Sequence, residues 1–379
     1  MSQKLFTIQI ILCILSVIYV QGAMRDITTM ELTREMGIGI NLGNTYESYG
    51  DWIKQWGDGT PKSYYTAWGS PEITVNAIGG YYKEGFRVLR IPVHWFNLMD
   101  DDYNISPDYL EAVKKTVDTA LGYGLYVIVN LHHDERNLFA NMVTDEKETS
   151  MKNYLKIWTQ VAEAFKDYDD HLVFESLNEE ACWGTVYNAW TGTEEEKLAN
   201  RKKVFALTLE INQNFVNLIR SSGGNNDKRH LLLAGYCTDF VETTNELFQL
   251  PTDPANRIAV SIHYYVPAAF AILTEDADWA KAQSTWGTAS DLQDLNNNLD
   301  QIKKRYIDNG VPVIIGEYGC PLKNKDEESV RSFIYNVCKG IYDRHMVPIL
   351  WDVQGDFYDR TTFEMIDPVL KDKLMSIPQ

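Results

Sequence analysis

Eight short apolar segments recur along this chain, and they limit its fold more than any other feature. The segments are 36–43, 86–93, 125–131, 172–178, 230–236, 258–264, 311–317 and 347–352. Most of them are hydrophobic almost throughout, which is typical of parallel strands buried on both faces. Helix-like stretches separate them, at 71–84, 107–121, 151–168, 200–220, 292–307 and 327–344, with a short one within 239–250. Strand and helix alternating eight times predict an α/β protein with a (β/α)8 TIM barrel.

A doubly wound open sheet would show the same alternation. None of the apolar segments is followed by GxGxxG or GxxxxGK[ST], the commonest signatures of that architecture. We also find no linker, low-complexity tract or internal repeat after the first residues, so a single domain over 23–379 is expected.

The N-terminal residues have the features of a secretory signal peptide. An early Lys4 precedes an apolar stretch from Phe6 to Val20, and the small residues Gly22 and Ala23 follow. The stretch is short for a membrane anchor and no basic cluster follows it. We therefore expect residues 1–22 to be removed and the mature protein to be secreted and free of the membrane.

Charge and cysteine content narrow the choice of partners. A formal net charge of -18 argues against nucleic acid or an acidic membrane surface and favours a neutral substrate. Four cysteines follow the signal peptide, Cys182, Cys237, Cys320 and Cys338; their even number permits disulfides without fixing a pairing. Their spacing does not match a metal site, so we expect neither metal nor cofactor, in a chain that acts as a monomer.

Polar or aromatic residues stand at the end of every apolar segment. They are Asn41, Asn44, Arg90, His132, His133, Asn178, Glu179, Tyr236, His263, Tyr265, Glu317, Trp351 and Asp352. In a TIM barrel the active site is built at the C-terminal ends of the strands. These residues are therefore expected to surround one cleft.

Two glutamates among them carry the chemistry. Glu179 ends the fourth segment and Glu317 the seventh, and two carboxylates across one cleft are the minimum for cleaving a glycosidic bond. Other carboxylates compete for these roles. Glu175 is expected deeper in the barrel with a structural partner, whereas Glu47 and Asp352 could bind sugar hydroxyls or cap loops.

Tryptophan is concentrated outside the predicted helices. Nine of ten lie in loops or at strand ends, namely Trp52, Trp56, Trp68, Trp95, Trp183, Trp190, Trp279, Trp286 and Trp351. Flat aromatic rings stack on the apolar faces of pyranose rings, although any one of these could instead pack on the barrel rim.

Adjacent histidines, His132 and His133, raise the alternative of a metal-dependent barrel hydrolase. Neighbouring residues of a strand point to opposite faces, so the two could chelate one ion only if the strand has already ended. We therefore favour a site without metal.

Several motifs, GINLGNTYES, FRVLRIPVHW, VIVNLHHD, FESLNEE, SIHYY, IIGEYG and ILWD, occur in order between residues 38 and 352. In these the chain resembles the glycoside hydrolase family 5 cellulases, retaining (β/α)8 enzymes that cut β-1,4-linked glucans. The resemblance implies that Glu179 is the general acid/base and Glu317 the nucleophile. It places Arg90, His132, Asn178, His263, Tyr265 and Trp351 around the point of cleavage, and Asn44 and His133 are expected to support substrate binding.

The chain departs from the family pattern at two places. NEE stands where many members have NEP, and WDVQGD replaces the more usual Trp-Asp-Asn-Gly, which puts the floor of the cleft in question. NLGNT and WGSPEIT resemble the part of the family that contains endoglucanases, lichenases and xyloglucanases. A mannanase on the same scaffold, or a catalytically silent carbohydrate-binding barrel, is a further alternative.

The neighbours expected from the sequence also predict ionisation states. Arg90 should favour an ionised Glu317, while partial burial and the nearby negative charge should keep Glu179 protonated.

Overall fold

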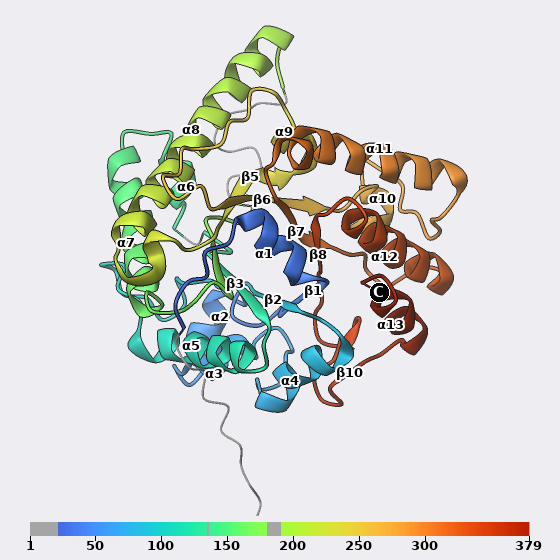
Figure 1. The fold of residues 1–379 in the computed structure, drawn as a ribbon, viewed down its shortest axis with the longest axis horizontal. Helices are drawn as coiled ribbons and strands as arrows, with labels where there is room; N and C mark the ends of the chain where they lie inside the picture. The colour runs from blue at the N-terminus through green and yellow to red at the C-terminus, as the bar shows by residue number, and fades with distance from the viewer. Residues whose placement is uncertain (1–21, 135, 180–190, 379) are drawn as a thin grey trace, which may run out of the picture.

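A closed barrel of eight parallel strands forms the centre of the molecule (Figure 1). The computed structural model describes residues 22–134, 136–179 and 191–378. The strands are β1 (Gly39–Asn41), β2 (Val88–Ile91), β3 (Tyr126–Asn130), β4 (Leu172–Glu175), β5 (Leu231–Asp239), β6 (Ile258–Tyr264), β7 (Val313–Tyr318) and β8 (Val347–Leu350). They follow one another around the barrel in chain order, and β8 closes it against β1. The predicted TIM barrel is confirmed, and each strand begins within a predicted apolar segment, although β5 and β7 continue beyond the predicted ends.

The main helices surround the barrel in Figure 1 and match the predicted stretches. They are α4 (Val75–Glu84), α5 (Pro107–Gly122), α7 (Lys147–Ala164), α8 (Glu194–Ser221), α9 (Phe240–Thr243), α11 (Ala289–Arg305) and α12 (Glu327–Tyr342). The helix expected within 239–250 is the four-residue α9. Helix α8 is longer than expected, because Thr193 and Glu196 form a capping box that starts it before residue 200.

Smaller elements were not expected from the sequence. They are α1 (Thr29–Met36), α2 (Asp51–Trp56), α3 (Pro61–Tyr65), α6 (Leu138–Asn141), α10 (Ala268–Ala271), α13 (Pro368–Met375) and a hairpin of β9 (Tyr358–Asp359) and β10 (Glu364–Met365). Helices α2 and α3 lie between β1 and α4, and the hairpin follows β8. Both insertions therefore extend loops at the C-terminal ends of strands.

Helix α1 lies across the N-terminal end of the barrel. Leu32 and Met36 are buried in a cluster with residues of strands β2 to β8, including Val88, Ile314 and Ile349. Arg25, just before the helix, holds the segment in place with a salt bridge to Asp170 at 2.6 Å. This end of the barrel is filled with apolar side chains, so the opposite end is the one left for chemistry.

The predicted signal peptide falls almost wholly outside the described residues and stays a prediction. Among the residues that the structure describes, none of the helices combines the length and the apolar character needed to cross a membrane.

Candidate active site

The predicted site residues come together because parallel strands place their C-terminal ends at one mouth. Strand pairing sets Asn41 beside Arg90, and it sets His263 beside Glu317. The sheet continues past Ile262 only after an irregularity in register between β6 and β7. Such irregularities re-aim side chains at barrel rims, and here the result is a histidine next to a predicted catalytic carboxylate.

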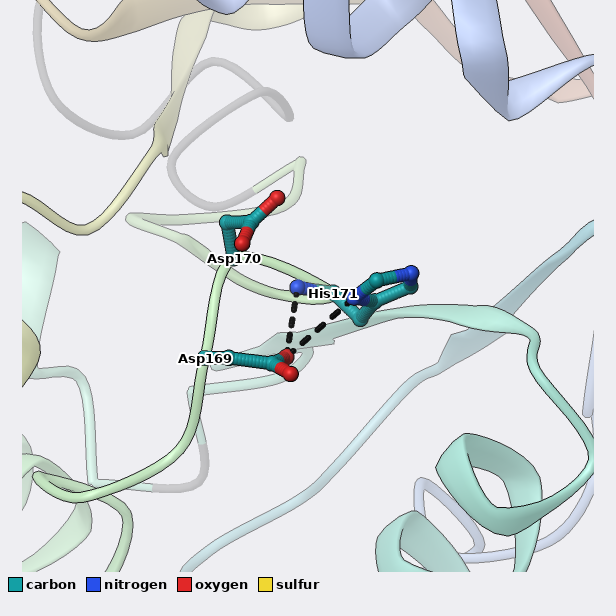
Figure 2. Close-up of side chains that lie close together, drawn as sticks. All are labelled: Asp169, Asp170 and His171. Carbon is teal, nitrogen blue, oxygen red and sulfur yellow. Dashed lines mark hydrogen bonds and ion pairs between the residues drawn. The ribbon is translucent and has the colours of Figure 1, made fainter. Parts of the chain in front are cut away.

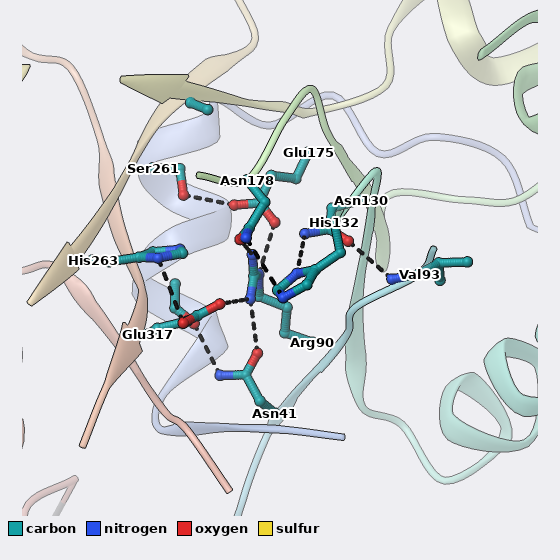
Figure 3. Close-up of polar contacts among 12 residues, drawn as sticks. Asn41, Arg90, Val93, Asn130, His132, Glu175, Asn178, Ser261, His263 and Glu317 are labelled. Carbon is teal, nitrogen blue, oxygen red and sulfur yellow. Dashed lines mark hydrogen bonds and ion pairs between the residues drawn. The ribbon is translucent and has the colours of Figure 1, made fainter. Parts of the chain in front are cut away.

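Arg90 is the centre of the buried polar network (Figure 3). Its guanidinium is fully buried and donates to Glu317 Oε1 at 2.7 Å, Glu175 Oε2 at 2.7 Å, Asn178 Oδ1 at 2.9 Å and Asn41 Oδ1 at 3.0 Å. A planar guanidinium with five donors can hold several acceptors in fixed positions at once. Arg90 therefore sets the positions of Glu317 and Asn178 relative to each other.

Glu175 has the structural role expected from its position. Its carboxylate is fully buried, and it also accepts a hydrogen bond from Ser261 Oγ at 2.6 Å. A buried charge is tolerated when it is paired and hydrogen-bonded, and Glu175 supplies that pairing for Arg90.

Glu179 and Glu317 face each other across His263. The Nδ1 atom of His263 lies 2.6 Å from Glu179 Oε1 and 3.5 Å from Glu317 Oε2. One carboxylate oxygen of each glutamate and the imidazole nitrogen all lie within 4.8 Å of one another. The Tyr265 hydroxyl donates to Glu317 Oε2 at 3.0 Å. The two carboxylates thus lie close enough to act on one bond.

The ionisation order expected from the sequence is wrong for the free protein. Burial raises the pKa of the Glu179 carboxyl, but the hydrogen bond and charge of His263 outweigh burial and lower that pKa below its ordinary value. Burial raises the pKa of Glu317 above its ordinary value, although His263 and Arg90 oppose this shift. The difference comes from His263, whose Nδ1 lies directly against the Glu179 carboxylate.

Trp351 and His132 form one wall of the site. Their rings are stacked with centroids 5.8 Å apart and an angle of 9° between the planes. The Nε2 atom of His132 lies 3.5 Å from Asn178 Nδ2, so the wall is joined to the Arg90 network. Burial holds the pKa of His132 well below its usual range, which keeps the imidazole neutral.

His133 belongs to a second aromatic group beside this wall. Its ring packs edge-on against His132 at 4.6 Å and lies 4.9 Å from the ring of Tyr49. Burial lowers the pKa of His133 to about 3, so this ring is neutral as well. Strand β3 ends at Asn130, so the two histidines lie beyond the strand and alternation between faces does not apply to them.

Asn44 lies in the loop after β1, next to the residue that packs against the Trp351 ring. The residue is half-buried, has a positive φ of 53°, and follows Gly43, where an added Cβ would lie 3.2 Å from the Trp351 ring. Its backbone N–H donates to Glu47. Asn44 therefore lies at the edge of the Trp351 floor, away from the Arg90 network.

Of the two roles open to Glu47 and Asp352, the structure supports loop capping. Glu47 is 1% exposed and accepts from the backbone of Thr45, while Asp352 is fully buried and accepts from the backbone N–H groups of Phe357 and Tyr358, each at 3.0 Å. Groups this deeply buried do not meet a sugar. Asp352 instead holds the loop after Trp351, where the sequence departs from the family pattern.

These two carboxyls predict a pH dependence of stability. Burial raises the pKa of Asp352 to about 7 and that of Glu47 to about 7. A carboxyl whose pKa is raised on folding stabilises the fold at acid pH, and that contribution is lost as pH rises toward the folded pKa. We expect the urea concentration at the unfolding midpoint to decrease as the pH is raised from about 4.5 to about 8.

Asp352→Asn should make this fall shallower, because it removes one of the two groups. The exposed Asp101→Asn is the matched control and should leave the slope unchanged. Equal slopes for Asp352→Asn and the unaltered protein would show that Asp352 does not carry the effect.

An open cleft of about 450 Å³ extends from Glu179 along β5, β6 and the loop to α10. Its lining includes His263, Tyr265 and the half-exposed Val241 and Ile272. Cys237 and Thr238 also line it; both have positive φ, 55° and 48°, at an irregularity in strand β5. The cleft provides an apolar surface on the Glu179 side of the site.

The tryptophans divide into two groups. Trp52, Trp56, Trp68 and Trp279 are at least about a third exposed, whereas Trp95 and Trp286 are buried and pack in the core. Trp52 and Trp56 lie on α2 rather than in a loop. Trp183 and Trp190 lie outside the described residues, as does Cys182.

Cys237, Cys320 and Cys338 are free thiols in the structure. Disulfides among these three, which the even count permitted, are therefore absent. Burial raises the pKa of Cys320 and Cys338 to about 12, so neither is a reactive thiolate.

Two groups of side chains in the described part of the chain are spaced closely enough to surround a metal ion. One is Glu179, His263 and Glu317 itself. The other is Asp169, Asp170 and His171, at the opposite end of the barrel before β4 (Figure 2). There Asp170 already accepts from the Arg25 guanidinium at 2.7 Å, so its charge is balanced by the protein. The expectation of a metal-free enzyme stays a prediction.

Three supporting residues had no role assigned from the sequence, although Asn41 was expected at the cleft. Asn41 and Ser261 fix the Arg90 network, and Asn130 lies 3.2 Å from His132 Nδ1. Asn41 and Asn130 both end a strand, so their positions carried a signal. Ser261 lies inside an apolar segment, and nothing in the pattern separates it from a core serine.

Comparison with known proteins places this site in a family. Residues 47–356 match the model of "Cellulase (glycosyl hydrolase family 5)". Endoglucanase A of Clostridium longisporum is 35% identical over 85% of this chain, which spans 58% of that protein's length. Endoglucanase A of Ruminococcus albus is 35% identical over 87% of this chain and 85% of its own length. A solved broad-specificity endoglucanase from an uncultured bovine rumen ciliate superposes with a TM-score of 0.81 at 32% identity, over 93% of this chain and 98% of that one.

A second solved structure contains a sugar. It is a family 5 lichenase from Caldicellulosiruptor sp. F32, a mutant in complex with cellotetraose, with a TM-score of 0.84 and 29% identity over 96% of this chain and 99% of that one. A closed barrel with paired carboxylates at its C-terminal mouth defines an enzyme of the glycoside hydrolase class. The matches show the family within this class: the chain belongs to the cellulase family, glycosyl hydrolase family 5.

Proposed function

We propose that this chain is a secreted endo-β-1,4-glucanase that cleaves β-glucans with retention of configuration. The observation that carries the mechanism is the separation of the two carboxylates, with oxygens of Glu179 and Glu317 within 4.8 Å of each other. Retaining glycosidases hold their carboxyl groups about 5 to 5.5 Å apart, and inverting ones about 6.5 to 9.5 Å apart to admit a water. The substrate class is supported by the relatives, whose names are those of endoglucanases and a lichenase.

In this mechanism Glu317 attacks the anomeric carbon and Glu179 protonates the departing oxygen. Arg90 donates to Glu317 Oε1 and the Tyr265 hydroxyl donates to Glu317 Oε2, so together they orient the carboxylate and stabilise its ionised form. Asn178, held by Arg90, is placed to bind the sugar hydroxyl next to the reacting carbon. Trp351 is the platform beneath that sugar.

In the free protein burial raises the pKa of Glu317, and the charges of His263 and Arg90 oppose this shift. His263 Nδ1 lies between the two carboxylates, 2.6 Å from one and 3.5 Å from the other, and orients both. Once Glu317 is esterified, Glu179 acts as the base for water, which suits its lowered pKa.

Product stereochemistry tests the mechanism, and a substrate panel tests the activity. Proton NMR at the start of cellooligosaccharide hydrolysis should show the β-anomer first; initial α-anomer would contradict retention. The mature chain should cut carboxymethyl cellulose, lichenan and xyloglucan faster than mannan, with a fall in viscosity that precedes most of the reducing ends. A preference for mannan would show that the protein is a mannanase instead. If no product forms from any of these polysaccharides, the protein is a carbohydrate-binding barrel without catalytic activity.

A further inference from the structure

Arg360 is a buried arginine that the proposed chemistry does not use. It follows β9 in the segment after β8, outside the residues matched by the family model, and its side chain is 4% exposed. A fully charged group at such depth needs several partners to offset its lost hydration. Its partners therefore indicate what it holds together.

The partners of Arg360 come mainly from the two loops that carry Asn44 and Trp351. From the loop after β1 it binds Gly43 O at 2.8 Å, Ser70 Oγ at 2.9 Å and Thr45 Oγ1 at 3.0 Å. From the loop after β8 it binds Asp352 O at 3.1 Å. Tyr81 on α4 accepts from its Nε at 3.1 Å.

These contacts fall next to two site residues. Gly43 O belongs to the residue just before Asn44, and Asp352 O belongs to the residue just after Trp351. Gly43 N also donates to Asp352 O at 3.0 Å, and Ser70 Oγ donates to Asn44 O at 2.6 Å. The guanidinium thus bridges the backbone on which the indole of Trp351 and the side chain of Asn44 are mounted.

The charges that face Arg360 belong to buried groups. Asp352 Oδ2 lies 3.4 Å away, and the carboxylate of Glu47 acts on Arg360 through its charge. A lysine would keep the positive charge but could not present the same fork of donors to six acceptors. Fork geometry, rather than charge alone, is what this position requires.

We propose that Arg360 is a positioning residue that fixes the Trp351 platform and the Asn44 loop relative to the catalytic glutamates. The inference rests on the proposed function for its catalytic consequence, while the position of the Trp351 ring can be measured without any substrate. Arg360 makes no contact with the two glutamates among the described interactions and acts through the floor.

The variant that tests this is Arg360→Lys, and Arg229→Lys is its matched control. Arg229 is equally buried and also donates to several carbonyls, including Leu172 O at 2.9 Å and Phe165 O at 2.8 Å, but it lies at the start of β5, at the other end of the barrel. Both variants remove a buried fork and both should lower the melting temperature. Only Arg360→Lys should disturb the site.

The first readout is the Trp351 indole N–H peak in a ¹⁵N-labelled spectrum, assigned with Trp351→Phe. It should shift or broaden in Arg360→Lys and stay in place in Arg229→Lys. The second is the binding of cellotetraose to the same variants made in a Glu317→Gln background. We expect the dissociation constant to rise about tenfold with Arg360→Lys, the size of effect that the loss of one or two oriented hydrogen bonds produces, and to be unchanged with Arg229→Lys.

An unmoved indole peak in folded Arg360→Lys, or an equal disturbance in Arg229→Lys, overturns the proposal. If Arg360→Lys does not fold, Ser70→Ala removes one acceptor of Arg360 and the donor to Asn44 O, and it must shift or broaden the peak relative to the unaltered chain. If the unaltered chain neither binds nor cuts any glucan, the proposed function fails, and the indole peak still decides the role of Arg360.

Discussion

Glu317→Gln should lower turnover of carboxymethyl cellulose by at least roughly a thousandfold, because a neutral amide cannot form the glycosyl ester on which the second half of the reaction depends. The amide retains the shape of the side chain and an oxygen for Arg90. The fold should therefore survive, as a melting curve or circular dichroism would verify. The assay is the release of reducing ends under saturating substrate.

The exposed Glu148→Gln on α7 is the control for this variant and should retain full activity. Substantial turnover by folded Glu317→Gln would mean that another carboxylate is the nucleophile. Glu175 would then be no substitute, because its carboxylate is fully buried beneath Arg90 and Ser261.

Glu179→Ala should separate substrates by the acidity of the group that leaves. On glucans, whose departing sugar needs a proton, the rate should fall by about 10² to 10⁴-fold, the usual contribution of a general acid. On 2,4-dinitrophenyl cellobioside, whose dinitrophenolate leaves without protonation, the rate of the first step should be almost unaffected. The comparison is made by measuring both substrates, and phenyl cellobioside as an intermediate case, with the same enzyme preparation.

An equal fall in the first-step rate on both aryl cellobiosides, measured as the initial burst of released phenolate, would contradict an acid role for Glu179. Replacing its hydrogen-bond partner gives an independent check. His263→Ala should impair the glucan reaction, because the imidazole lies between the two carboxylates and orients Glu179.

The apolar segments were sufficient to predict the barrel because a parallel strand buried on both faces leaves almost no polar positions. Several strands are shorter than the segments: β1 has only Gly39–Asn41 of the predicted 36–43. The remaining residues of the segment are mostly buried but do not pair with a neighbouring strand. Hydrophobicity alone does not separate such residues from strand residues. Helix α1 could not be predicted from pattern alone, since its apolar residues Leu32 and Met36 gain their partners only from the distant strands.

The site was predicted where chemistry depends on residues at strand ends and missed where it depends on contacts across the chain. His263 was expected next to Glu179, but its effect on the pKa order follows from a distance that no spacing in the sequence gives. Arg360 is a stronger case. It binds Gly43 from 317 positions away in the sequence, and nothing around it marks it as different from an arginine on the surface.

Helix α1 has a consequence for how the protein is made. The cluster that covers Leu32 and Met36 includes Val347 and Ile349 of β8, so the surface on which α1 packs is complete only after the last strand has been synthesised. The earliest described helix of the chain is thus among the last that can bury its apolar face. Until then the apolar face of α1 stays uncovered, and the base of the barrel can close only as synthesis ends.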